Sequence, residues 1–180
     1  MKTLKSLASF VVALLLFGLI PDTSLYAQKA PQLTDPEIAS IAVTANQIDV
    51  DYAILAEKKS KNAEILRFAK TMKDDHNAVI KLATDLAHKL GVTPKMNATT
   101  QSLLDGAKKE TALLHSKSHN AFNKAYIDNE VAYHKAVVGT VETVLIPQSK
   151  NAELKALLVK VLPTLKTHLE HAEMVQKNLK

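Results

Sequence analysis

Hydrophobic residues recur at helical spacing along three long segments, and each apolar stripe carries one histidine near its middle. Residues three and four apart share a helix face, so we expect amphipathic helices over about 63–90, 120–147 and from 152 to near the end of the chain. The stripes are Ile65, Phe68, Met72, His76, Val79, Ala83, Leu86 and Leu90; Ile127, Val131, His134, Val138, Val141 and Leu145; and Leu154, Leu158, Val161, Leu165, His168, Ala172, Val175 and Leu179.

Start and stop signals predict another helix before these three. Thr34 or Asp35 can cap it, a proline and a glutamate follow in its first turn, and it runs to about Lys58. A short polar turn then leads to the 63–90 helix, and Gly91 stands where a C-terminal glycine cap belongs. So short a turn makes these two helices antiparallel neighbours.

The segment 92–118 has a different character, because it is rich in Thr, Asn and Ser and lacks a long apolar stripe. We predict a long crossover that contains a short helix around 102–114. Pro147 should stop the following helix, and a further turn leads to the last helix, which Pro163 should bend or interrupt.

Two antiparallel hairpins joined by one long crossover give the connectivity of a ferritin-like four-helix bundle. No segment shows the alternation of a strand worth assigning. The predicted fold class is therefore all-α, and an up-and-down bundle with a decorated loop is the alternative.

The first 27 residues have the pattern of an export signal. Two lysines precede an apolar run, 7–20, which is shorter than the roughly 20 residues of a membrane-spanning helix, and small or polar residues follow up to Ala27. We expect cleavage after Ala27, a linker over 28–34, a single domain over 35–180 and no transmembrane anchor after cleavage.

Composition adds two limits. The chain has no cysteine, which excludes disulfides, thiolate ligands and a cysteine nucleophile. Its net charge of +5 is spread over lysines interleaved with acidic residues, a pattern typical of solvated helices and not of a nucleic-acid surface. We expect a soluble protein in the periplasm, with outer-membrane association or secretion as alternatives.

The candidate chemistry lies at the middle of the helices, where Asp49, His76, His134 and His168 fall. Midpoints of helices of similar length share one level in a bundle, so these side chains should converge in the core. Burying each without a partner costs about 1–3 kcal/mol. A transition metal ion would provide a common partner, and three imidazoles with a carboxylate suit zinc, copper, iron or manganese.

A metal-free polar layer that fixes helix register is the alternative, and the sequence leaves both open. Other polar residues lie close enough in sequence to orient the ligands or to pair with the histidines. These are Asp75, Tyr126, Glu130, Tyr133 and His171. We predict surface positions for His88, His115 and His119, and a packing role for Met72.

Three segments resemble an exported bacterial family catalogued as domain of unknown function 4142, whose members are often labelled outer membrane proteins. They are 68–76 (FAKTMKDDH), 122–134 (FNKAYIDNEVAYH) and 162–172 (LPTLKTHLEHA). The resemblance implies export and a ferritin-like bundle, and implies no activity. Where this family usually has a glutamate in the first helix, the chain has Asp49.

The sequence favours a non-enzymatic role, because it lacks a phosphate-binding loop, a nucleophile elbow and a His-Glu-x-x-His motif. Di-iron ferritin-like proteins use Glu-x-x-His pairs, whereas this chain has Lys73 before His76 and His168 before His171. Ferritin-type iron storage is therefore disfavoured. The leading hypothesis is metal handling or envelope stress protection, and the alternative is a structural or interaction bundle.

Overall fold

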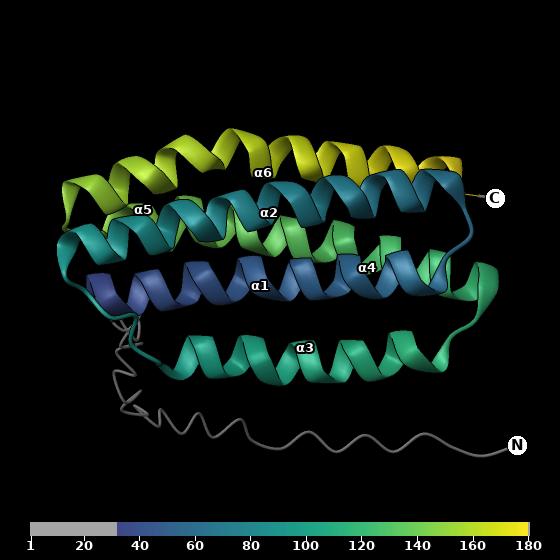
Figure 1. Cartoon of the computed structure of the whole chain (residues 1–180), viewed down its shortest axis with the longest axis horizontal. Coiled ribbons are helices and arrows are strands. Elements are labelled where there is room, and N and C mark those ends of the chain that lie inside the picture. Colours follow the sequence, from purple (N-terminus) through teal and green to yellow (C-terminus); the bar gives the residue numbers. More distant parts are fainter. Residues whose placement is uncertain (1–31, 180) are drawn as a thin grey trace, which may run out of the picture. The chain divides into compact units, whose positions relative to one another are not determined.

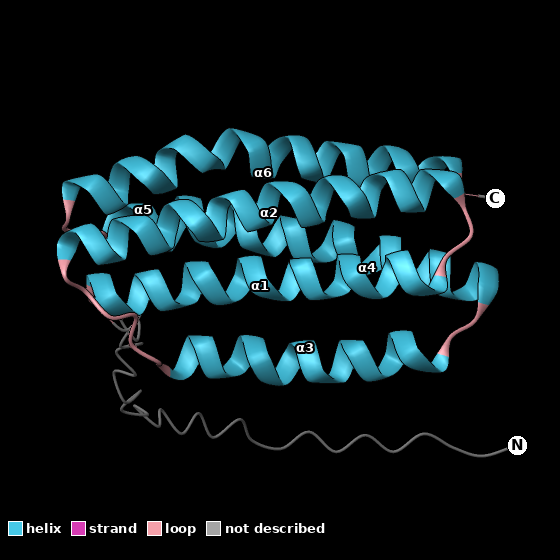
Figure 2. Cartoon of the chain, in the orientation of Figure 1, coloured by secondary structure: helices cyan, strands magenta, loops and turns pink. Residues whose placement is uncertain are grey.

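The computed structural model describes residues 32–179, which form an all-helical bundle (Figure 1). Figure 2 shows only helices and loops in this part of the chain. The predicted export signal, most of the linker and Lys180 lie outside the described residues.

Four long helices form the bundle, and a further helix lies in the crossover. The predicted ferritin-like fold is confirmed. The elements are α1 (Asp35–Lys59), α2 (Ala63–Leu90), α3 (Ala98–Ser116), α4 (His119–Thr140), the π-helical segment η1 (Val141–Leu145), α5 (Ile146–Gln148) and α6 (Ala152–Asn178).

The ends of α1 and α2 follow from local capping chemistry. The Thr34 backbone N–H donates to the Glu37 carboxylate at 2.9 Å, which closes a capping box at the start of α1. The Asn62 side chain accepts from two backbone N–H groups at the start of α2. Gly91 ends α2 with φ of 62°, in the left-handed region that glycine adopts without strain. Both predicted helices are confirmed.

Around the bundle the order is α1, α2, α6, α4, so each hairpin packs along the other. The crossover helix α3 lies outside this square and packs mainly on α1 (Figure 1). It was predicted as a short helix around 102–114, but it has 19 residues. The Asn97 side chain caps it at Thr100 N, and Leu114 is buried in the core, so tertiary contacts extend it.

The helix before Pro147 departs from regular α geometry. Its last turns form η1, and the helix ends at Gln148, one residue beyond the predicted stop. A proline ring crowds the carbonyl four residues earlier, and the wider π turn before Pro147 relieves that crowding. By contrast, α6 continues through Pro163 without a break and arches near its middle (Figure 1).

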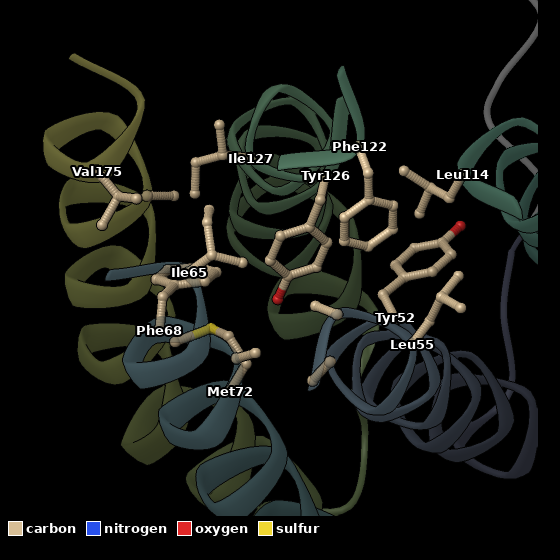
Figure 3. Close-up of a cluster of buried hydrophobic side chains, with 14 of the residues drawn as sticks. Tyr52, Leu55, Ile65, Phe68, Met72, Leu114, Phe122, Tyr126, Ile127 and Val175 are labelled. Carbon is tan, nitrogen blue, oxygen red and sulfur yellow. The ribbon is translucent and has the colours of Figure 1, made fainter. Parts of the chain in front are cut away.

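The core has two parts that differ in character. At one end of the bundle, aromatic side chains from three helices pack together, among them Tyr52, Phe68, Phe122 and Tyr126 (Figure 3). The other end is aliphatic. There the apolar stripe of α2 is only half buried, in contrast to its first half.

The two hairpins are joined by Asp35, whose carboxylate accepts from Lys150 N at 2.8 Å and Asn151 N at 2.9 Å. We expect Asp35→Ala to lower the free energy of unfolding by about 1–2 kcal/mol, because both charge-assisted bonds are lost. Chemical denaturation of the variant and the parent protein measures this loss.

The matched control is Asp85→Ala, which removes an exposed pair with Lys81 on α2. Such a pair contributes about 0.3–0.5 kcal/mol. Equal losses in the two variants would contradict a role for Asp35 in joining the hairpins.

Candidate metal centre

All four bundle helices place ionisable side chains in one buried layer between the two parts of the core. Asp49 comes from α1, His76 from α2, Glu130 and His134 from α4, and His168 from α6. None of the five is more than 3% exposed. The three histidines lie within apolar stripes, so folding the stripes inward carries the imidazoles into the core.

Two of the imidazoles are oriented by oxygen acceptors outside the layer. The Nδ1 atom of His134 lies 3.0 Å from the backbone carbonyl of Glu130, and the Nε2 atom of His168 lies 2.9 Å from the Asp75 carboxylate. Because both partners are acceptors, these nitrogens carry the ring hydrogens. The lone pairs are then on Nε2 of His134 and Nδ1 of His168.

The third imidazole is oriented by Asn46, which the sequence analysis missed. Its amide nitrogen donates to the Ala42 carbonyl at 2.8 Å, so its oxygen faces Nδ1 of His76 at 2.7 Å. The lone pair of His76 is therefore on Nε2. The available signal was the position of Asn46 one helical turn before Asp49, on the same side of α1.

The three lone-pair nitrogens are buried and make no hydrogen bond within the described residues. One ring nitrogen from each of His76, His134 and His168 lies within 4.8 Å of the others. The ring centroids are 5.1–5.6 Å apart. Neutral imidazoles held from behind by acceptors are the form in which histidine binds metal ions.

Asp49 completes a possible ligand set. Its Oδ2 atom is 3.4 Å from Nε2 of His76 and 3.5 Å from Nε2 of His134. Two ligands about 2.0–2.1 Å from a tetrahedral ion are about 3.3–3.4 Å apart, which is close to these separations. A cavity of about 10 Å³ borders all three residues. Such a space suits one sphere of about the size of water.

Burial favours the neutral forms of the ionisable groups in this layer. Neither carboxylate oxygen of Asp49 or Glu130 has a hydrogen-bond partner in the described chain. Burial raises the pKa of both carboxyl groups, and burial lowers the pKa of His76 to about 2 and of His134 to about 4. The imidazoles are thus neutral, and two ionised carboxylates would be balanced by one divalent cation.

Glu130 lies among the candidate ligands themselves and not behind them. It was predicted to support a ligand, but its carboxylate forms a second triad with Asp49 and His134, with ligand atoms within 4.8 Å of one another. It precedes His134 by one turn of α4, and the rotation of α4 turns both side chains inward. Asp75, in contrast, contacts only the outer nitrogen of His168, at 2.9 Å.

The remaining candidates lie at the margin of the layer. Tyr133 donates its hydroxyl to the Ala45 carbonyl at 2.9 Å, and the Tyr126 hydroxyl is buried without a partner among the described residues. His171 packs against the ring of Phe68, with centroids 5.1 Å apart. None of these three hydrogen-bonds to an imidazole of the layer.

The histidines and the methionine that were not predicted as metal ligands lie away from the layer. His88, His115 and His119 are exposed, as predicted. Met72 is buried in the aromatic part of the core, and Lys73 pairs with a glutamate of α1 at 2.6 Å. None of the helices over residues 32–179 combines the length and the hydrophobicity needed to cross a membrane.

The family model described as a domain of unknown function (DUF4142) matches residues 21–175. A solved structure described as "CopM in the Cu(II)-bound form" aligns with a TM-score of 0.62 at 15% sequence identity, covering 82% of this chain and 100% of that chain. At this identity the likeness shows a shared fold. No curated protein matches the chain.

Proposed function

The chain belongs to the DUF4142 family, a domain of unknown function, and from this premise we propose that it binds one divalent transition metal ion in the centre of its bundle. The proposed ligands are His76, His134, His168 and Asp49. Glu130 is a further oxygen ligand or the charge partner of the ion.

One observation carries this proposal: the three imidazoles that come together in the core each have a buried ring nitrogen without a hydrogen-bond partner among the described residues. A buried polar atom left unpaired costs about 1–3 kcal/mol. Three such atoms at one level, each on a ring fixed by an acceptor on its other side, are costly in a metal-free core and are satisfied together by a single ion.

Cu(II) and zinc are the two metals that suit these ligands best. Imidazole ligands suit both ions, and Cu(II) has the higher affinity for a given nitrogen and oxygen site. The site has no thiolate, the kind of soft ligand that selects Cu(I). The structural neighbour described as Cu(II)-bound supports testing copper first. Iron and manganese complete the test set.

The proposed role is metal handling or protection from metal stress outside the inner membrane. The ligands are nearly inaccessible to solvent, which favours holding an ion over presenting it to a substrate. Ferritin-type iron storage stays disfavoured, because Lys73 faces Glu57 where a bridging carboxylate would be needed. The alternative remains a bundle in which the layer only fixes helix register.

Metal content tests the proposal directly. We expect about one equivalent of a single metal in the purified, untagged protein after incubation with Cu(II), Zn(II), Fe(II) or Mn(II) in turn and desalting, measured by elemental mass spectrometry. The variant H76A/H134A/H168A should retain none. With copper, electron paramagnetic resonance should show coupling to nitrogen.

The control variant H88A/H115A removes two exposed histidines and should bind as the parent protein does. Circular dichroism establishes that each variant is folded. A metal-free parent protein, or equal binding by the layer variant, would refute the metal site and leave the structural alternative.

The stability of the variant His134→Leu distinguishes metal binding from a purely structural layer. In metal-free protein the variant should be as stable as the parent or more stable by about 1 kcal/mol, because an unpaired buried nitrogen is removed. With metal at 100 times its Kd, the parent should gain about 2.7 kcal/mol and the variant much less. Thermal unfolding with and without Cu(II) measures both. A purely structural layer predicts no response to metal in either protein.

Export is proposed from the first 27 residues. We expect protein recovered from the periplasm to begin at or near Gln28 when its amino terminus is sequenced. Leu14→Arg within the apolar run should leave the full-length chain in the cytoplasm. Unprocessed parent protein in the cytoplasm would contradict export.

A further inference from the structure

The aliphatic end of the bundle contains a second, much larger cavity, which is partly open to solvent. Its volume is about 340 Å³, and it is lined by residues of α1, α2, α3, α4, η1 and α6. Ligand pockets in proteins commonly measure about 300–1,000 Å³, and an apolar cavity of about 150 Å³ is enough to bind benzene. None of the proposed metal ligands lines this cavity.

The cavity explains why the second half of the α2 stripe is only half buried. Val79, Ala83, Leu86 and Leu90 line this space, and Leu86 also packs against the aliphatic part of the core. Aliphatic side chains from the other walls complete the lining. Among them are Ala42, Val137, Val141, Leu154, Leu158 and Val161.

Apart from Thr99, which is exposed, the polar side chains of the lining are paired within the protein. Asn46 hydrogen-bonds to His76 and to a backbone carbonyl of α1. The Tyr133 hydroxyl donates to another backbone carbonyl of α1, and the Thr140 hydroxyl donates to a backbone carbonyl of α4. At the other end, Asp35 accepts from backbone N–H groups before α6, and Asn151 caps α6. Water needs free polar partners to be held, so this cavity favours an apolar occupant.

Backbone irregularities form part of two walls of the cavity. Val141 and Leu145 of η1 line it, and π turns are frequent at functional sites. On α6, the other helix of the same hairpin, Pro163 lies between the lining residues Val161 and Leu165. An unfilled space of this size lowers the stability of a core, so helices that keep it open indicate a ligand.

The cavity is elongated along the helix axes. On α1 its lining runs from Asp35 to Asn46, and on α2 from Val79 to Leu90. Each span corresponds to about 16 Å at 1.5 Å per residue. We propose that this cavity is a binding site for a single alkyl chain, either a free aliphatic molecule or the tail of a single-chain amphiphile.

The test uses metal-free protein, so that its result does not depend on the metal site. Binding of n-octanol, n-decanol, n-dodecanol and n-tetradecanol is measured by isothermal titration calorimetry below their solubility limits. We expect the Kd to fall about fourfold with each added methylene until the chain exceeds the length of the cavity, and then to level off. A Kd that does not depend on chain length would overturn the proposal.

Three variants locate the site. Ala83→Phe fills the cavity and should weaken dodecanol binding at least tenfold, whereas Leu86→Ala enlarges it and should move the levelling-off to longer chains. Ala78→Phe, on the exposed face of α2, is the matched control and should bind as the parent does.

Thermal unfolding shows which variants are folded. If Ala83→Phe does not fold, the alcohol series measured with Leu86→Ala tests whether the alcohols bind in the cavity. Unchanged binding by a folded Ala83→Phe, together with an unshifted Leu86→Ala series, would place the alcohols on the surface and refute the site. Comparing dodecanol with dodecanoate distinguishes a neutral molecule from a charged amphiphile as the preferred ligand.

Discussion

The burial of five ionisable side chains at one level of the core is the constraint on which this structure depends. Aliphatic contacts tolerate a shift of one helix by a turn, because one leucine replaces another. A shift of about 5.4 Å would separate a histidine from the other members of the layer and leave it unpaired. Asp49, His76, His134 and His168 thus fix the relative heights of all four helices.

The acceptors that orient the three imidazoles are arranged as specifically as the imidazoles themselves. Each imidazole is held by a different kind of acceptor: an amide oxygen from Asn46, a backbone carbonyl in α4, and the carboxylate of Asp75. These acceptors fix the tautomers before any ion arrives, which lowers the cost of organising a metal site. A layer that only set register would need no inward lone pairs, and this is why we favour metal binding over a purely structural role.

The layer also separates two unlike halves of one bundle. On one side, aromatic rings fill the core closely (Figure 3). The crossover helix α3 runs along α1 beside both halves (Figure 1). On the other side, a π turn and Pro163 accompany a cavity with a largely apolar lining. Ala45, Asn46, Tyr133, Val137 and Leu165 border both this cavity and the small space beside the histidines. An alkyl chain and a metal ion would therefore share a wall.

Periodicity and capping in the sequence determined the four helices, both ends of α2 and the mid-helix positions of Asp49 and the histidines, because these depend on contacts within a turn or two of one helix. Their meeting at one level depends in addition on how the four helices pack. The sequence did not determine the length of α3, the π turn, the partner of His76 or the inward position of Glu130. Those features depend on how each helix is rotated and spaced against its neighbours. Only tertiary packing decides that, since the same stripe can close over a filled core or over a cavity.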